Sequence, residues 1–103
     1  MYKAVDPPAL HAMLGEATPQ LVDVRSAEEF ARGAIPGARH IELAALPARL
    51  TELDPASPIV LYCLSGARSA QACAFLAQRG FGSLYHLEGG IAAWARAGLP
   101  VTG

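Results

Sequence analysis

Apolar residues occur in short, continuous runs along this chain of 103 residues. The runs at residues 21–24 and 59–62 consist largely of valine, leucine and isoleucine. Runs of this kind and length are typical of strands that are buried on both faces of a parallel sheet. Residues 2–5, 38–41 and 83–87 are expected to form three further strands. The hydrophobic pattern therefore predicts a five-stranded sheet.

Segments with helical character separate these strands. Asp6 is expected to cap one helix, because proline follows it in the first turn. Ser26 and Glu29 have the spacing of a capping box, which predicts a short second helix that ends near Gly33. Three later segments also have helical character: residues 43–53, with leucine at helical spacing, residues 70–78 and residues 91–97. Because strands and helices alternate with short connections, residues 1–103 are expected to form one α/β domain with helices on both faces of a parallel sheet.

Composition and charge narrow the range of functions. Hydrophobic residues make up 52% of the chain, which is enough for a core and too high for a disordered protein. The net charge of −1 gives no reason to expect nucleic acid or an acidic membrane surface as a partner. No apolar run approaches the ~20 residues needed to cross a bilayer. Residues 1–8 lack the apolar centre of a secretory signal, so the sequence favours a cytoplasmic location.

Cys63 lies where the apolar strand at residues 59–62 ends and a helix begins. Ligands bind at the carboxyl ends of strands in open parallel sheets, and a helix start adds unpaired N–H groups and a positive partial charge. The following loop is made of small residues and contains Gly66, so its amides can converge on an anion. Arg68 adds a permanent positive charge. Since a thiol in such surroundings ionises easily, we expect Cys63 to be reactive.

For the other polar or reactive side chains, the sequence favours a structural or surface role over a catalytic one. Cys73 lies inside the alanine-rich helix and is expected to pack in the core, and two cysteines are too few for a disulfide framework. Asp23 is costly to bury alone, and Arg25 is a candidate for the same polar network. The histidines do not have the spacing of a metal site: His11, His40 and His86. His40 and His86 are expected near the loop, with a surface position favoured for both.

Three parts of the chain resemble, in order, the sequence signatures of rhodanese domains. They are residues 21–38, which contain LVDVR, EF and GAIPGA, residues 62–69, with the sequence YCLSGARS, and residues 87–101, which contain LEGGI and Trp94. Each part alone is weak evidence, but the three together are specific to the family. The sequence departs from the family at Ala34, where many members have histidine. That histidine does not act as a base for the nucleophile in sulfur transfer, so we expect only a local effect.

The resemblance implies a rhodanese-like, three-layer α/β/α fold around a five-stranded parallel sheet in the order 3-2-4-5-1. In this order the strands at residues 21–24 and 59–62 lie side by side where the winding reverses, which is where ligands bind. The resemblance also implies a sulfurtransferase. In such an enzyme a thiolate takes the outer sulfur of a donor such as thiosulfate as a persulfide, and an acceptor then removes it.

The resemblance also assigns roles to individual residues. Cys63 is expected to be catalytic and to carry the sulfur, while Asp23 and Arg25 are expected to brace the site. The donor-binding loop is expected to consist of Leu64, Ser65, Gly66, Ala67, Arg68 and Ser69. Its amides would stabilise the anionic sulfur, and Arg68 would attract an anionic donor. No metal or cofactor is implied, and the expected partners are thiosulfate as the donor and cyanide or a thiol, such as glutathione or thioredoxin, as the acceptor.

Two other functions stay open at this point. Phosphatases and arsenate reductases of similar fold also use a cysteine and an arginine, but their loops are one residue longer. The loop from Cys63 to Arg68 has six residues, which suits a single sulfur better than a tetrahedral oxyanion. The other alternative is a non-catalytic sulfur carrier or interaction module. Such domains often lack the loop cysteine that is present here.

Overall fold

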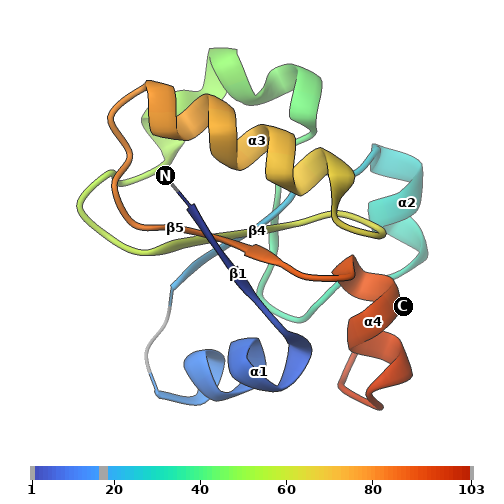
Figure 1. Ribbon diagram of the computed structural model, residues 1–103. Coiled ribbons are helices and arrows are strands. Elements are labelled where there is room, and N and C mark those ends of the chain that lie inside the picture. The colour runs from blue at the N-terminus through green and yellow to red at the C-terminus, as the bar shows by residue number, and fades with distance from the viewer. Residues whose placement is uncertain (1, 17–18, 103) are drawn as a thin grey trace.

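Strands and helical segments alternate along the chain, as the sequence pattern predicted. The structure is a computed structural model that describes residues 2–16 and 19–102 (Figure 1). Its elements are, in order, β1 (Tyr2–Val5), α1 (Pro7–Glu16), β2 (Gln20–Asp23), α2 (Ala27–Arg32), β3 (Arg39–His40), the 3₁₀ segment η1 (Leu43–Glu52), β4 (Ile59–Tyr62), α3 (Ala67–Gln78), β5 (Leu84–Leu87) and α4 (Gly90–Arg96). In the described part of the chain, no helix combines the length and the apolar character needed to span a membrane.

The five strands form one parallel sheet in the order β1-β5-β4-β2-β3. This is the expected order 3-2-4-5-1, written from the opposite edge. Strands β2 and β4 are neighbours, with Leu21 opposite Val60 and Asp23 opposite Tyr62. The two strands therefore end together, and the loop after β4 lies beside the segment that follows β2.

Alternate side chains of β4 contribute to two hydrophobic cores, one on each face of the sheet. Ile59 and Leu61 belong to the core under α3 and η1, whereas Val60 and Tyr62 belong to the core under α1 and α4 (Figure 1). All four side chains are 1% exposed or less. Because β4 is covered on both faces, every one of its positions favours an apolar or aromatic residue, which explains the continuous run in the sequence.

Two helical segments differ from the expectation. Residues 43–52 form a 3₁₀ segment with a kink at Arg49, where the leucine spacing predicted an ordinary helix. Pro47 lies inside this segment and has no N–H to donate to the preceding turn, which disfavours regular helical hydrogen bonding. Helix α3 begins at Ala67, earlier than the expected residue 70. Gly66 caps it in a left-handed conformation, with φ of +119°, and so turns the loop directly into the helix.

Candidate active site

The loop that contains Cys63 joins the carboxyl end of β4 to the first turn of α3. The Cys63 sulfur accepts hydrogen bonds from the amide of Gly66 at 3.0 Å and from the amide of Ser69 at 3.4 Å. The hydroxyl oxygen of Ser69 lies 3.7 Å from the same sulfur. Donors from the main chain thus converge on one atom. Such preorganised donors stabilise negative charge where it develops during a reaction.

Helix α4 holds the loop in this orientation. The amide of Ile91 donates to the carbonyl of Cys63 at 2.9 Å. The amide of Ala92 donates to the carbonyl of Leu64 at 3.1 Å. A trans peptide directs its carbonyl and its N–H to opposite sides, so the peptide between Leu64 and Ser65 directs the Ser65 amide away from α4. The first turn of α4 therefore orients the loop amides, and its own unpaired N–H groups are satisfied by the loop carbonyls.

Gly90 permits this close approach between α4 and the loop. Its φ is +63°, a conformation that favours glycine, and a Cβ at this position would overlap the carbonyl groups of Leu64 and Cys63. Any other residue here would force the loop or the helix to move. Gly90, the first residue of α4, which the sequence analysis noted only as part of a signature, thus has a physical role in the site.

The hydrogen bonds around Cys63 favour its thiolate form. Burial would by itself raise the pKa of the thiol, since the residue is only 1% exposed. The amide and hydroxyl of Ser69, together with the amides of Gly66 and Ser65, outweigh burial and hold the pKa of the Cys63 thiol below its ordinary value. Cys63 therefore has the electrostatic surroundings that a reactive thiol requires, and its reactivity itself stays a prediction.

Arg68 is paired with Glu29, a residue for which the sequence indicated only a capping role. The guanidinium binds both carboxylate oxygens, at 2.7 and 3.0 Å. The same carboxylate accepts a hydrogen bond from the amide of Ser26, which completes the predicted capping box. The hydrogen bonds from Arg68 lower the pKa of Glu29 to about 2, so the pair is ionised at neutral pH. Arg68 is thus largely neutralised, which changes the expectation of a free cation beside the sulfur.

Asp23 and Arg25 form a buried ion pair next to the loop. Their side chains meet at 2.7 Å, and Arg25 also donates to the carbonyl of Gly33 at 2.7 Å. The hydroxyl of Tyr62 accepts a hydrogen bond from the amide of Ile35 at 3.1 Å. These contacts connect the end of β2, the turn after α2 and the end of β4. In the described part of the chain, neither member of the pair is hydrogen-bonded to Cys63, which fits the bracing role expected for them.

The remaining loop residues differ in exposure, and open cavities lie beside them. Leu64, Ser65 and Ala67 are exposed, and of these three residues Ser65 stabilises the anionic sulfur through its main-chain amide. A cavity of about 440 Å³ is lined by Leu64, Glu29 and residues of α4. A second cavity, of about 500 Å³, is lined by Arg68 and by apolar residues of η1 and α3. Both volumes are large enough for a small sulfur donor or acceptor.

His40 and His86, for which a surface position was favoured, are both half-buried and keep part of their surface exposed. His40 bonds to the carbonyl of Arg25 at 2.7 Å and stacks on Phe30 with ring centres 4.8 Å apart. His86 lies on β5, and its Nδ1 is 3.2 Å from the hydroxyl oxygen of Ser69. The strand order indicates that His86 lies near the Cys63 loop, since β5 is the neighbour of β4 and ends at the same edge.

Among the described residues, no group of three or more His, Cys, Asp or Glu side chains is placed to hold a metal ion.

Comparisons with known proteins agree with this architecture. A model of the rhodanese-like domain matches residues 6–97. A sulfurtransferase of Allochromatium vinosum is 49% identical over 81 residues, which cover 79% of this chain and 76% of the relative. The thiosulfate sulfurtransferase GlpE of Stutzerimonas stutzeri is 36% identical, over 90% of this chain and 84% of its own. The crystal structure of a rhodanese-related protein from Thermoplasma volcanium superposes with a TM-score of 0.90 at 29% identity, over 98% of each chain.

Proposed function

The chain belongs to the rhodanese-like domain family, and we propose that within this family it acts as a thiosulfate sulfurtransferase. In this proposal Cys63 takes a sulfane sulfur from thiosulfate, or from a persulfide donor, and passes it to cyanide or to a thiol. The names of its relatives support the sulfurtransferase class, and the two named above are a sulfurtransferase and a thiosulfate sulfurtransferase.

The proposed reaction has two steps. The Cys63 thiolate attacks the outer sulfur of thiosulfate, a new S–S bond forms, and the bond to the sulfonate sulfur breaks. Sulfite leaves with the electron pair, and the outer sulfur of the persulfide keeps one negative charge. An acceptor such as cyanide then attacks this outer sulfur, leaves as thiocyanate and returns the Cys63 thiolate. Covalent two-step transfer of this kind produces ping-pong kinetics.

One observation carries the proposal: the amides of Gly66 and Ser69 point at the Cys63 sulfur at 3.0 and 3.4 Å. These donors stabilise the thiolate before attack, and the same small ring of amides suits the negative charge of a persulfide. The six-residue loop from Cys63 to Arg68 also suits a single sulfur better than the larger phosphoryl group that a phosphatase loop encircles.

Intact-mass measurement after treatment with thiosulfate tests the proposal. We expect a gain of one sulfur atom on the peptide that contains Cys63, and its removal by cyanide with formation of thiocyanate. The Cys63→Ala variant should gain no sulfur, whereas Cys73→Ala should gain it as the wild type does. Equal turnover of thiosulfate by Cys63→Ala and the wild type would disprove the catalytic assignment.

The same protein preparation distinguishes the alternative functions. A Cys63-dependent burst of phenol from an aryl phosphate, with no gain of sulfur from thiosulfate, would identify a phosphatase. A persulfide that forms but is passed to none of cyanide, glutathione and thioredoxin would identify a carrier. The cytoplasmic location and the choice among these acceptors stay predictions from the sequence.

A further inference from the structure

Behind the loop, the hydroxyl of Ser69 connects the Cys63 sulfur to a histidine on a different strand. Ser69 is fully buried. Its oxygen lies 3.7 Å from the sulfur of Cys63, 3.1 Å from the carbonyl oxygen of Gly66 and 3.2 Å from Nδ1 of His86. Cys63 lies at the end of β4, Ser69 at the start of α3 and His86 on β5. The packing of α3 on the sheet therefore decides the distances among the three side chains.

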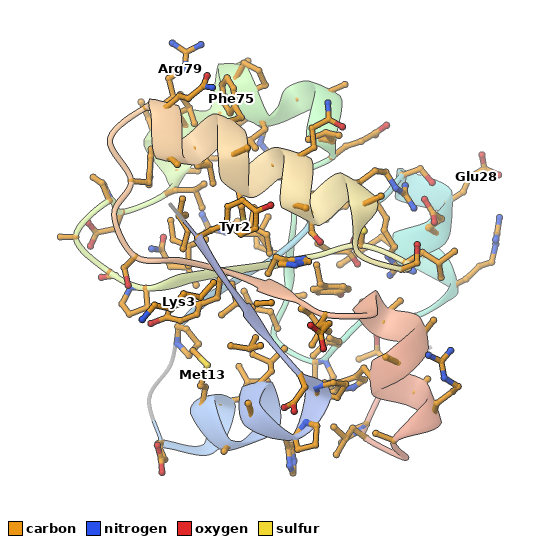
Figure 2. All side chains as sticks on the ribbon, viewed as in Figure 1. Tyr2, Lys3, Met13, Glu28, Phe75 and Arg79 are labelled. Carbon is orange, nitrogen blue, oxygen red and sulfur yellow. The ribbon has the colours of Figure 1, made fainter. Side chains whose placement is uncertain are left out.

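His86 is held in place by its neighbours. Its ring packs edge-on against the ring of Tyr2, with ring centres 5.6 Å apart. Tyr2 belongs to β1 and lies on the α3 side of the sheet (Figure 2). On its other side, Cε1 of His86 is 3.6 Å from the place where a side chain on Gly66 would begin. The imidazole is therefore packed between β1 and the loop and presents Nδ1 to Ser69.

The hydrogens of this group can be counted. The Ser69 hydroxyl has one hydrogen to donate, and three acceptors surround it: the Gly66 carbonyl, an anionic sulfur on Cys63, and Nδ1 of His86 when that nitrogen is bare. When Nδ1 carries a hydrogen, it donates to the Ser69 oxygen instead. The serine hydrogen then has no acceptor on the histidine side, and its two remaining acceptors are the Gly66 carbonyl at 3.1 Å and the sulfur at 3.7 Å, of which the sulfur carries the negative charge.

We propose that His86 is a positioning residue, which donates from Nδ1 to Ser69 and thereby directs the Ser69 hydroxyl to the anionic sulfur of Cys63. Its effect on the thiolate is independent of the proposed function, and only its effect on the persulfide depends on sulfur transfer. His86 itself does not contact the sulfur or the donor. It acts through the serine, in the same way that a second group orients the base in a catalytic triad.

The charged and titratable groups around His86 are consistent with this role. They are Cys63 from the loop, Tyr2 from β1 and Glu88, two residues further along the chain. Burial lowers the pKa of His86, against an opposing effect of the Glu88 carboxylate, so the ring is mostly neutral at pH 7. A neutral imidazole holds one hydrogen, and an anionic sulfur beyond the serine favours the tautomer with that hydrogen on Nδ1.

The pH dependence of Cys63 alkylation by iodoacetamide tests the proposal without any sulfur donor. Ser69→Ala and His86→Leu should each raise the thiol pKa by about 0.5 to 1 unit, which slows alkylation at pH 7 by about three- to tenfold. The double variant should shift no further than Ser69→Ala, because the histidine acts through the serine. His86→Asn should restore the wild-type profile, since its amide nitrogen can take the place of Nδ1. His11→Phe is the matched control. His11 lies on α1 and packs against Trp94 on the opposite face of the sheet, so this variant should leave the pH profile of Cys63 alkylation unchanged.

Two outcomes would overturn the proposal. One is an unchanged profile in His86→Leu together with a shift in Ser69→Ala. The other is an equal shift in His86→Leu and His86→Asn, which would indicate loss of packing alone. Thermal melting of each variant shows whether it is folded before its profile is compared. Failure of the wild type to gain sulfur from thiosulfate would reject the proposed function and leave the result on the thiolate intact.

Discussion

The two cysteines of this protein have nearly the same burial and opposite acid–base properties. Cys63 is 1% exposed and Cys73 is 0% exposed, and they lie ten residues apart in the same loop and helix. The packing position expected for Cys73 is confirmed, because the residue lies in the core under α3. Burial raises its pKa to about 12, whereas the pKa of Cys63 lies below its ordinary value.

Hydrogen-bond donors account for the difference. The sulfur of Cys73 lies 3.5 Å from the carbonyl oxygen of Tyr85, an acceptor, and so has no donor in this contact to stabilise its anion. The sulfur of Cys63 faces the amides of Gly66 and Ser69. A low exposed fraction therefore does not by itself raise the pKa of a thiol. The direction of the surrounding peptide groups decides whether the pKa of a buried thiol lies above or below its ordinary value.

The largest expected contrast is the rate of alkylation of the two thiols. At pH 7 we expect iodoacetamide to modify Cys63 more than about a hundredfold faster than Cys73, since the thiolate is the nucleophile and Cys73 remains a thiol. Peptide mapping of a time course measures both rates in one sample. Comparable rates at the two sites in folded protein would contradict the contrast.

Gly90→Ala should remove much of the difference in pKa between the thiols of Cys63 and Cys73. The added Cβ overlaps the carbonyls of Leu64 and Cys63, so the loop must move and its amides turn away from the sulfur. We expect sulfur transfer to fall by about a hundredfold, by analogy with the loss of one oriented donor. Gly15→Ala is the matched control, because a Cβ on Gly15 meets no atom within 4 Å. Similar activity in the two variants would refute the role of Gly90.

Cys73→Ala should affect stability and leave sulfur transfer unchanged. Loss of the buried sulfur is expected to cost about 1 kcal/mol in the free energy of unfolding, measured by urea denaturation. The contribution of Cys73 to the pH dependence of the free energy of unfolding has a defined sign. In the unfolded chain Cys73 ionises near pH 9, and in the folded chain only near its raised pKa of about 12, so it destabilises the folded state as the pH rises between these values. Cys73→Ala should therefore lose less stability than the wild type from pH 8 to pH 10, and an equal loss would contradict this account.

The smallest expected effect concerns the charge beside Cys63. Glu29→Gln keeps a side chain that can complete the capping box and removes the charge that neutralises Arg68. We expect the KM for thiosulfate to fall by up to about fivefold, equivalent to about 1 kcal/mol for a partly exposed ion pair. Glu28→Gln is the control, because Glu28 projects from the same helix without a part in this pair (Figure 2). A KM that stays the same or rises would show that Arg68 does not bind the donor.

Much of the fold could be predicted because it depends on neighbours in the sequence. The run at residues 59–62 is continuously apolar because both faces of β4 are covered. Ser26 and Glu29 close their capping box across a single turn. The position of Cys63 between a strand and a helix is likewise a local property. The strand order came from the family resemblance, since periodicity does not specify which strands are neighbours.

The partners within the site could not be predicted in this way. Arg68 and Glu29 are 39 residues apart, and Ser69 and His86 are 17 apart. Whether such side chains meet depends on how α2 and β5 are placed against the loop, to within an ångström or two. The close approach of α4 that makes Gly90 necessary is of the same kind.

The sequence by itself determined where the strands and helices lie and which sulfur stands at a strand end, because hydrophobic periodicity and capping act over a few residues. Only the tertiary structure decided which charges Arg68 meets, which way the loop amides point and which histidine reaches Ser69. Hydrogen bonds and ion pairs depend on distance and direction between elements, and these are set when the helices pack on the sheet.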